Sequence, residues 1–235
     1  MLGQAILLGL SSFITQMTIV IIALVCNIML VKYGALSQYG VDIPIAVIGI
    51  ESKVFTVVIN IVVGIVLGCQ PVIGFNMGAG NYLRVKKLYK SILMATLVIG
   101  LAATLLFELF PDFVTGMFGQ PTNIPNPDDY WEFARMTFRI FLALVSFTCF
   151  IKLTAIFFQA LGKPITAVIA SVVRDIVFFV PLIIILPRFL GIKGILIAAP
   201  AADLAAMIIA VALTAIFFKK LDKAELPEKT EASCS

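Results

Sequence analysis

The sequence contains no histidine, and only 13% of its 235 residues are charged. The missing imidazole removes the commonest general base and the commonest metal ligand of proteins. An ordinary globular domain is about 25% charged, so this chain has too few charges to cover the outside of a soluble fold. These two shortages argue against a soluble enzyme, a disordered chain and a nucleic-acid-binding domain.

Cysteine is also scarce, with four residues at positions 26, 69, 149 and 234. No two of them form a C-x-x-C pair, and three lie inside apolar runs. This pattern predicts reduced thiols, with neither a metal site nor a disulfide framework. We therefore expect a protein without a cofactor and without a bound metal.

Apolar residues, by contrast, make up 61% of the chain, and the mean hydropathy is +1.11. A helix needs about 20 apolar residues to cross a hydrocarbon core about 30 Å thick. Six stretches satisfy this requirement, which predicts an all-α integral membrane protein, a six-transmembrane-helix bundle in the lipid bilayer. The predicted spans are residues 5–31, 44–75, 91–110, 133–161, 164–186 and 194–218, within a membrane unit of residues 1–221.

The connections between the spans differ in charge. Residues 76–90 hold four Lys or Arg and no acid, whereas residues 111–131 hold three Asp and no Lys or Arg. Because Lys and Arg gather in cytoplasmic loops, we expect residues 76–90 and both termini to be cytoplasmic in a multi-pass protein of a bacterial inner or plasma membrane. The polar residues 222–235 are predicted to form a disordered cytoplasmic tail.

Ionisable side chains inside the predicted spans are candidates for the substrate or ion pathway, because an unpaired charge at a helix centre costs about 2.5–3.5 kcal/mol. They are Glu51, Lys53, Lys152, Arg174, Asp175 and Asp203, to which we add the uncharged Gln16, Asn27 and Asn60. Either these groups are structural pairs and interhelical hydrogen bonds that fix the packing of the helices, or they line a wet cavity.

Helix geometry restricts the pairing of these charges. Glu51 and Lys53 point about 200° away from each other on one helix, and Arg174 and Asp175 diverge by about 100°. We therefore expect ion pairs between helices and not within them, with Arg174–Asp203 as the first pair. Each of the spacings Gly64-xxx-Gly68 and Gly74-xxx-Gly78 would allow close helix approach.

Three segments carry the motifs of one family. The first runs from Gly49-Ile-Glu-Ser-Lys-Val to the basic residues after position 83, and it contains Gly64, Gly68, Gln70, Pro71, Gly74, Asn76 and Gly78. The others are Phe158-Gln-Ala-Leu-Gly162-Lys-Pro, followed by Arg174 and Pro181, and Ala199-Pro-Ala-Ala-Asp203. In this order they resemble the multidrug and toxic compound extrusion (MATE) transporters.

The resemblance implies one lobe of a two-lobe (6+6) transporter, and the long connection before the fourth span resembles that of the C-terminal six-helix lobe. It implies export of organic cations or amphipathic drugs in exchange for H⁺ or Na⁺, with a missing N-terminal six-helix lobe or a second copy as partner. One branch of the family has coupling carboxylates on the first and fourth helices of this lobe. Here the first helix has Gln16 and Asn27, so coupling would fall to Glu51, to Asp203 or to the missing lobe.

Two other interpretations remain open. A lipid-linked oligosaccharide flippase of related architecture would need a cationic cavity, which Lys53, Lys152 and Arg174 could supply. A non-transporting membrane remnant or interaction subunit would need no cavity at all. An enzyme is not expected, because no catalytic constellation is present in the sequence.

Overall fold

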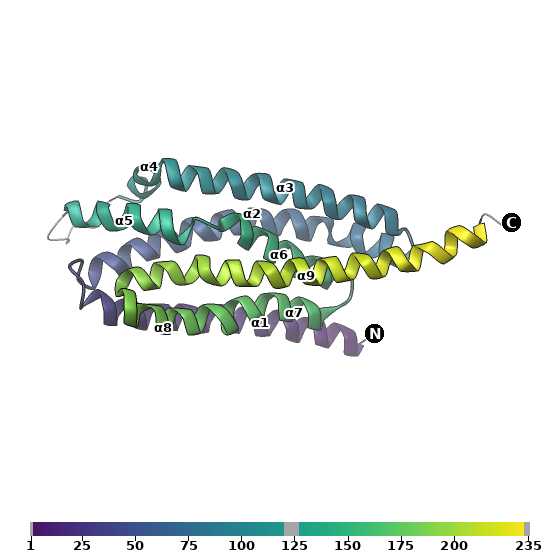
Figure 1. Cartoon of the computed structure of the whole chain (residues 1–235), viewed down its shortest axis with the longest axis horizontal. Helices are drawn as coiled ribbons and strands as arrows, with labels where there is room; N and C mark the ends of the chain where they lie inside the picture. Colours follow the sequence, from purple (N-terminus) through teal and green to yellow (C-terminus); the bar gives the residue numbers. More distant parts are fainter. Residues whose placement is uncertain (1, 120–126, 233–235) are drawn as a thin grey trace.

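A computed structural model describes residues 2–119 and 127–232, and every regular element in these ranges is helical. The elements are α1 (Leu2–Gly34), α2 (Asp42–Gly78), α3 (Tyr82–Leu109), α4 (Pro111–Gly116), α5 (Pro127–Phe141), α6 (Val145–Ala160), α7 (Pro164–Val172), the π-helical η1 (Val173–Phe179), α8 (Val180–Leu190) and α9 (Ile192–Ala232). The helices lie side by side as an elongated bundle (Figure 1).

Five helical segments are long and apolar enough to cross a membrane, and α5 and α6 supply a sixth if they are taken as one span bent by 46°. The five are α1, α2, α3, the continuous run from α7 through α8, and α9. The predicted all-α membrane bundle is thus confirmed. The span predicted over residues 133–161 therefore corresponds to this bent pair, and no Pro or Gly marks the bend at residues 142–144.

The predicted span 164–186 is interrupted by the π-helical turn η1. The amide of Val180 donates to the carbonyl oxygen of Asp175, five residues earlier. Pro181, which follows directly, has no N–H group to donate. Next to this proline, the backbone hydrogen bonds change from a four-residue to a five-residue spacing, and this change produces the wider turn.

Helix α9 continues through Ala232, so residues 222–232 are helical in the structure where the sequence led us to expect a disordered tail. Lys, Glu, Ala and Leu dominate residues 222–232, and these residue types have high helix propensity. An already formed apolar helix can therefore extend into this polar segment. Residues 233–235 lie outside the described part of the chain.

One end of the bundle gathers the start of α1, the end of α9, the α2–α3 turn and the α6–α7 turn (Figure 1). At the opposite end, the hydroxyl group of Tyr39 donates to Glu132 Oε1 over 2.8 Å. Burial, followed by this contact with Glu132, raises the pKa of Tyr39. The phenol therefore remains a hydrogen-bond donor at physiological pH and ties the α1–α2 connection to α5.

Of the four α2 glycines in the two spacings, only Gly74 lies against another helix in the described chain. A Cβ atom added at Gly64, Gly68 or Gly78 would meet no atom within 4 Å, and one at Gly74 would touch only the Ala160 carbonyl oxygen at 3.4 Å. Closer contacts occur at Gly100, where a Cβ would lie 2.8 Å from Ser146 Cα, and at Gly194, where it would lie 2.5 Å from the Leu186 carbonyl carbon. Gly100 thus lets α3 approach α6, and Gly194 lets α9 approach α8.

Candidate functional site

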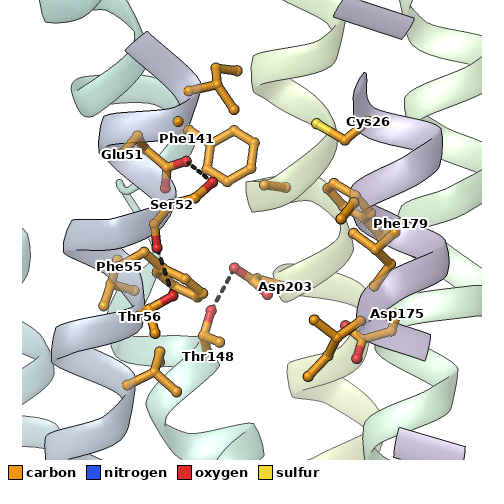
Figure 2. A pocket seen from close by; sticks show the side chains of 18 of the residues that line it. Cys26, Glu51, Ser52, Phe55, Thr56, Phe141, Thr148, Asp175, Phe179 and Asp203 are labelled. Carbon is orange, nitrogen blue, oxygen red and sulfur yellow. Dashed lines mark hydrogen bonds between the residues drawn. The ribbon is translucent and has the colours of Figure 1, made fainter. Parts of the chain in front are cut away.

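A cavity of about 650 Å³ is lined by residues of α1, α2, α6, η1 and α9, and α1 and η1 lie across the space from α2 (Figure 2). Eight of the nine pathway candidates line it: Gln16, Asn27, Glu51, Asn60, Lys152, Arg174, Asp175 and Asp203. Lys53 is exposed and belongs to a different face of α2 from Glu51, as its spacing predicted. Side chains from five separate helical segments therefore converge on one space.

Helix periodicity explains why α1 and α2 present polar groups to this space. Gln16 and Asn27 are eleven residues apart, which is about three turns, so they share one face of α1. Ser52, Thr56 and Asn60 follow one another at four-residue intervals on α2 and also share a face. Polar residues thus form two stripes that border the cavity.

An ion network lies in the part of the cavity wall that α6, η1 and α9 form. Arg174 Nε donates to Asp203 Oδ1 over 2.8 Å, and Arg174 Nη1 donates to Asp175 Oδ1 over the same distance. Thr148 Oγ1 donates to the second carboxylate oxygen of Asp203 at 2.8 Å. The side chains of Asp175 and Asp203 are 3% and 4% exposed, so a single guanidinium is paired with two buried carboxylates and balances one of their two negative charges.

The predicted Arg174–Asp203 contact between helices is confirmed. The exclusion of an Arg174–Asp175 contact was wrong, because these neighbours form an ion pair. The exclusion assumed a regular α-helix and considered only the directions of the side chains. Arg174 lies in the wider π-helical turn, and its long side chain lets Nη1 contact the neighbouring Asp175 while Nε contacts Asp203.

Glu51 is the acid of the cavity wall that has no cation beside it among the described residues. It is 1% exposed, and its Oε1 atom has no hydrogen-bond partner. The Ser52 hydroxyl reaches Oε2 at a long 3.4 Å. Figure 2 shows Glu51 and Ser52 on one side of the space, with Cys26 and Phe179 opposite and Asp203 between them. One buried carboxyl group is thus incompletely satisfied.

Lys152 brings a further charge to the cavity from α6. It lies close enough to Arg174, Asp175 and Asp203 for their charges to act on it. Within the described chain, however, its ammonium group makes no ion pair and no hydrogen bond. The network therefore leaves one cation and one acid, Lys152 and Glu51, without fixed partners.

Several cavity residues were not predicted from the sequence. Thr148 is one of them. Its position four residues before Lys152, on the same face of α6, is the sequence feature that could have predicted its place in the cavity wall. The aromatic rings of Phe141 and Phe179 are others, and they join Phe55 on the cavity wall. Single aromatic residues in apolar helices carry no such signal, because most of them pack in the core or face lipid.

The motif residues of α2 from Gly64 onward lie in the second half of that helix, outside the cavity. Pro71 is inside the helix, and the buried Asn76 donates through Nδ2 to the Val72 carbonyl oxygen over 2.8 Å. Gly162 has φ +68° in the α6–α7 turn, which explains the need for glycine there. These motif residues therefore shape helices and turns, whereas Glu51, Arg174 and Asp203, from the same motif segments, line the cavity. In the described chain, no group of three His, Cys, Asp or Glu side chains could hold a metal ion.

The fold is similar to that of solved membrane transporters. One match is a MATE transporter in a bent conformation, at 20% identity and a TM-score of 0.82, covering 95% of this chain and 47% of that one. Another is an outward-facing multidrug resistance MATE family transporter of the MOP superfamily, at 19% identity and a TM-score of 0.77, covering 92% and 46%.

A third match comes from Pyrococcus furiosus, a MOP superfamily transporter whose binding pocket of reversed polarity suggests a different function for that protein. It has 20% identity and a TM-score of 0.79, and the alignment covers 91% of this chain and 46% of that one. The chain thus spans about half the length of the solved transporters that it matches. No curated protein matches the sequence.

The comparison with family models finds one that describes most of the sequence. The MatE model matches residues 12–185, a range that includes α2 with its glycine, glutamine and proline motif, the α6–α7 turn and the π-helical segment with Arg174. Since this match covers more than half of the chain and the fold agrees with it, the chain belongs to the MATE family of membrane transporters.

Proposed function

We propose that the chain forms one lobe of a secondary-active exporter that exchanges organic cations or amphipathic drugs for H⁺ or Na⁺. The observation that carries this proposal is the incompletely satisfied carboxyl group of Glu51 in the wall of a 650 Å³ cavity. The rings of Phe55, Phe141 and Phe179 line the same cavity and suit flat cationic molecules. Family membership supports transport as the activity.

Exchange needs a site that two cations can occupy in turn. Asp175 and Asp203 are a poorer choice, because Arg174 already forms an ion pair with each of them at 2.8 Å. Glu51 has no such partner, so a proton, a sodium ion or a cationic drug can satisfy it one at a time. Competition for one carboxylate couples the release of one ligand to the binding of the other.

A second six-helix lobe is the proposed partner, with this chain as the C-terminal lobe. The chain spans about half the length of its solved relatives. Gln16, Asn27 and Asn60 line the cavity yet are exposed, so the cavity is open along α1 and α2. Polar groups are costly against lipid, and substrate sites of repeat transporters lie between the repeats. A second copy of this chain is the alternative partner.

The direct test is ethidium efflux from cells that express the chain, a complementary MATE lobe, or both. We expect proton- or sodium-dependent efflux only when both lobes are present, because the cavity then has its second wall. A chain carrying Arg135→Leu, a change at an exposed pair away from the cavity, is the matched control and should export normally. Robust ion-coupled efflux by the chain alone would contradict the two-lobe proposal.

A flippase for lipid-linked oligosaccharides is the second candidate, and the specific observation in its favour is Lys152. Its ammonium group lines the cavity without a fixed partner in the described chain. A pyrophosphate-linked substrate would require several such cations. Arg174, the cavity's other cation, is held by Asp175 and Asp203, which favours the cation exporter.

For its location, we propose a bacterial inner or plasma membrane with both termini in the cytoplasm. Cysteine introduced at Ala79, an exposed residue of the α2–α3 turn, should react with a membrane-impermeant maleimide only after the cells are opened. Cysteine at Leu36, 77% exposed at the opposite end of the bundle, is the matched control and should react in intact cells. The assay uses a background in which the four native cysteines are alanine. The reverse pattern of labelling would invert the proposed topology.

A further inference from the structure

A second hollow lies on the outside of the bundle, separate from the central cavity. It is a groove of about 310 Å³ between α2 and α3, lined by Val72, Asn76, Arg84, Lys87, Leu88 and Ser91. None of these residues lines the central cavity. The groove therefore has to be explained separately from the transport site.

The groove carries two cations without counter-ions. Arg84, Lys87 or Leu88, and Ser91 recur at intervals of three or four residues, so they share one face of α3. Residues 76–90 contain no acid. Arg84 and Lys87 are exposed, and neither makes an ion pair with any residue that the structure describes. An anion in the groove would meet two free positive charges.

The depth of the groove matches the lipid headgroups. With 37 residues, α2 is about 55 Å long, whereas the hydrocarbon core is about 30 Å thick and the bilayer with headgroups about 40–45 Å. Asn76 is in the last turn of α2, and Arg84 is in the first turn of α3. Asn76 directly follows the apolar run that ends at residue 75, and Arg84 precedes the run that begins at residue 91, so both belong to the polar boundary where lipid phosphates lie. Val72 and Leu88 lie one turn closer to the middle of their helices.

Asn76 adds an unsatisfied acceptor to this basic groove. The residue is 6% exposed, and its Nδ2 group donates to the Val72 carbonyl oxygen at 2.8 Å. Its Oδ1 atom is buried and has no partner. A buried acceptor without a donor costs about 1–3 kcal/mol. A ligand that brings a hydroxyl donor beside its phosphate would remove this penalty.

We propose that the groove binds one phosphatidylglycerol-type lipid. The phosphate diester lies between Arg84 and Lys87, a headgroup hydroxyl donates to Asn76 Oδ1, and the acyl chains run along Val72 and Leu88. The two cations select an anionic lipid, and the amide oxygen selects a headgroup with a hydroxyl group. A lipid bound here would join the end of α2 to the start of α3, across the turn at residues 79–81.

The charge requirement is tested with the purified chain in a neutral detergent, titrated with dioctanoyl phosphatidylglycerol and followed by native mass spectrometry. Each basic residue near anionic lipid contributes about 1 kcal/mol, so Arg84→Gln/Lys87→Gln should weaken binding about 30-fold. Lys219→Gln/Lys220→Gln removes two exposed charges at the same end of the bundle and should change binding less than 2-fold. Equal losses in the two double variants would overturn the proposal, because general charge attraction would then explain binding.

The headgroup requirement is tested on the unmodified chain, which avoids any folding defect of an Asn76 variant. Dioctanoyl phosphatidylmethanol has the same phosphate diester without the hydroxyl groups, so it should bind about 5-fold more weakly than phosphatidylglycerol. Asn76→Leu should bind both lipids equally, with its helix content checked by circular dichroism. Equal affinity of the unmodified chain for the two lipids would overturn the role of Asn76. Displacement of the lipid by equimolar inorganic phosphate would show that free phosphate is the ligand.

Discussion

Replacing Glu51 by Gln should abolish ion-coupled drug export while leaving the helices folded. The amide matches the carboxyl group in shape, but it carries no charge and exchanges no proton. A hydrogen bond to a charged group contributes about 1.5–3 kcal/mol, so a cationic drug should bind about 10- to 150-fold more weakly. The measurements are ethidium binding by fluorescence and ethidium efflux, both in the two-lobe assembly.

The pH dependence of ethidium binding tests whether Glu51 is the carboxyl group for which protons and the drug compete. In the unmodified protein, ethidium binding should weaken as the pH falls, because protons and the drug compete for the Glu51 carboxylate. In the Glu51→Gln variant the profile should be flat, although the other ionisable groups around the cavity are unchanged. Those groups are Cys26 on α1, Lys152 on α6, Arg174 and Asp175 on η1, and Asp203 on α9.

The matched control for this variant is Glu108→Gln. It makes the same chemical change on α3, none of whose residues lines the cavity, so export and its pH dependence should persist. Wild-type efflux by Glu51→Gln would place the coupling carboxylate elsewhere, with the partner lobe as the next place to test. A loss of efflux in both variants would indicate damage unrelated to the cavity.

Hydropathy predicted the membrane bundle because a bilayer imposes one requirement on each span, about 20 apolar residues in a helix. The exceptions arise where tertiary contacts decide the local structure. The bend between Phe141 and Val145 has no Pro or Gly, and the π-helical turn before Pro181 depends on how one amide is satisfied. Periodicity assumes a regular α-helix, so it cannot locate either feature.

The cavity was partly predictable for a similar reason. A charge inside a span must find a partner or water, so Glu51, Arg174 and Asp203 stood out in the sequence. The sequence did not show the surroundings of each charged group, because the packing of the helices decides which carboxyl group lies beside a cation. Arg174 reaches two carboxylates, and Glu51 reaches no cation in the described chain. Thr148 was missed because a hydroxyl group in an apolar helix can bond to its own backbone and needs no partner.

The Arg174 network should be the most sensitive point of the fold to substitution. Arg174→Leu leaves Asp175 and Asp203 buried without their cation, at 3% and 4% exposure. Removing one partner of a buried ion pair costs about 3–5 kcal/mol. For a chain of this size, that loss corresponds to a fall of about 6–20 °C in the thermal midpoint. The measurement is thermal unfolding in detergent.

Two further variants separate structure from transport. Arg135→Leu removes a pair whose side chains are both 53% exposed, so its midpoint should change by less than about 4 °C. Arg174→Leu/Asp175→Asn/Asp203→Asn removes all three charges together and should recover most of the lost stability, because well-packed neutral groups often replace a buried ion pair without penalty. If this triple variant also exports ethidium, the network only holds η1 against α9. If it is stable but inactive, the charges act in transport, whereas a midpoint unchanged by Arg174→Leu alone would contradict the ion network itself.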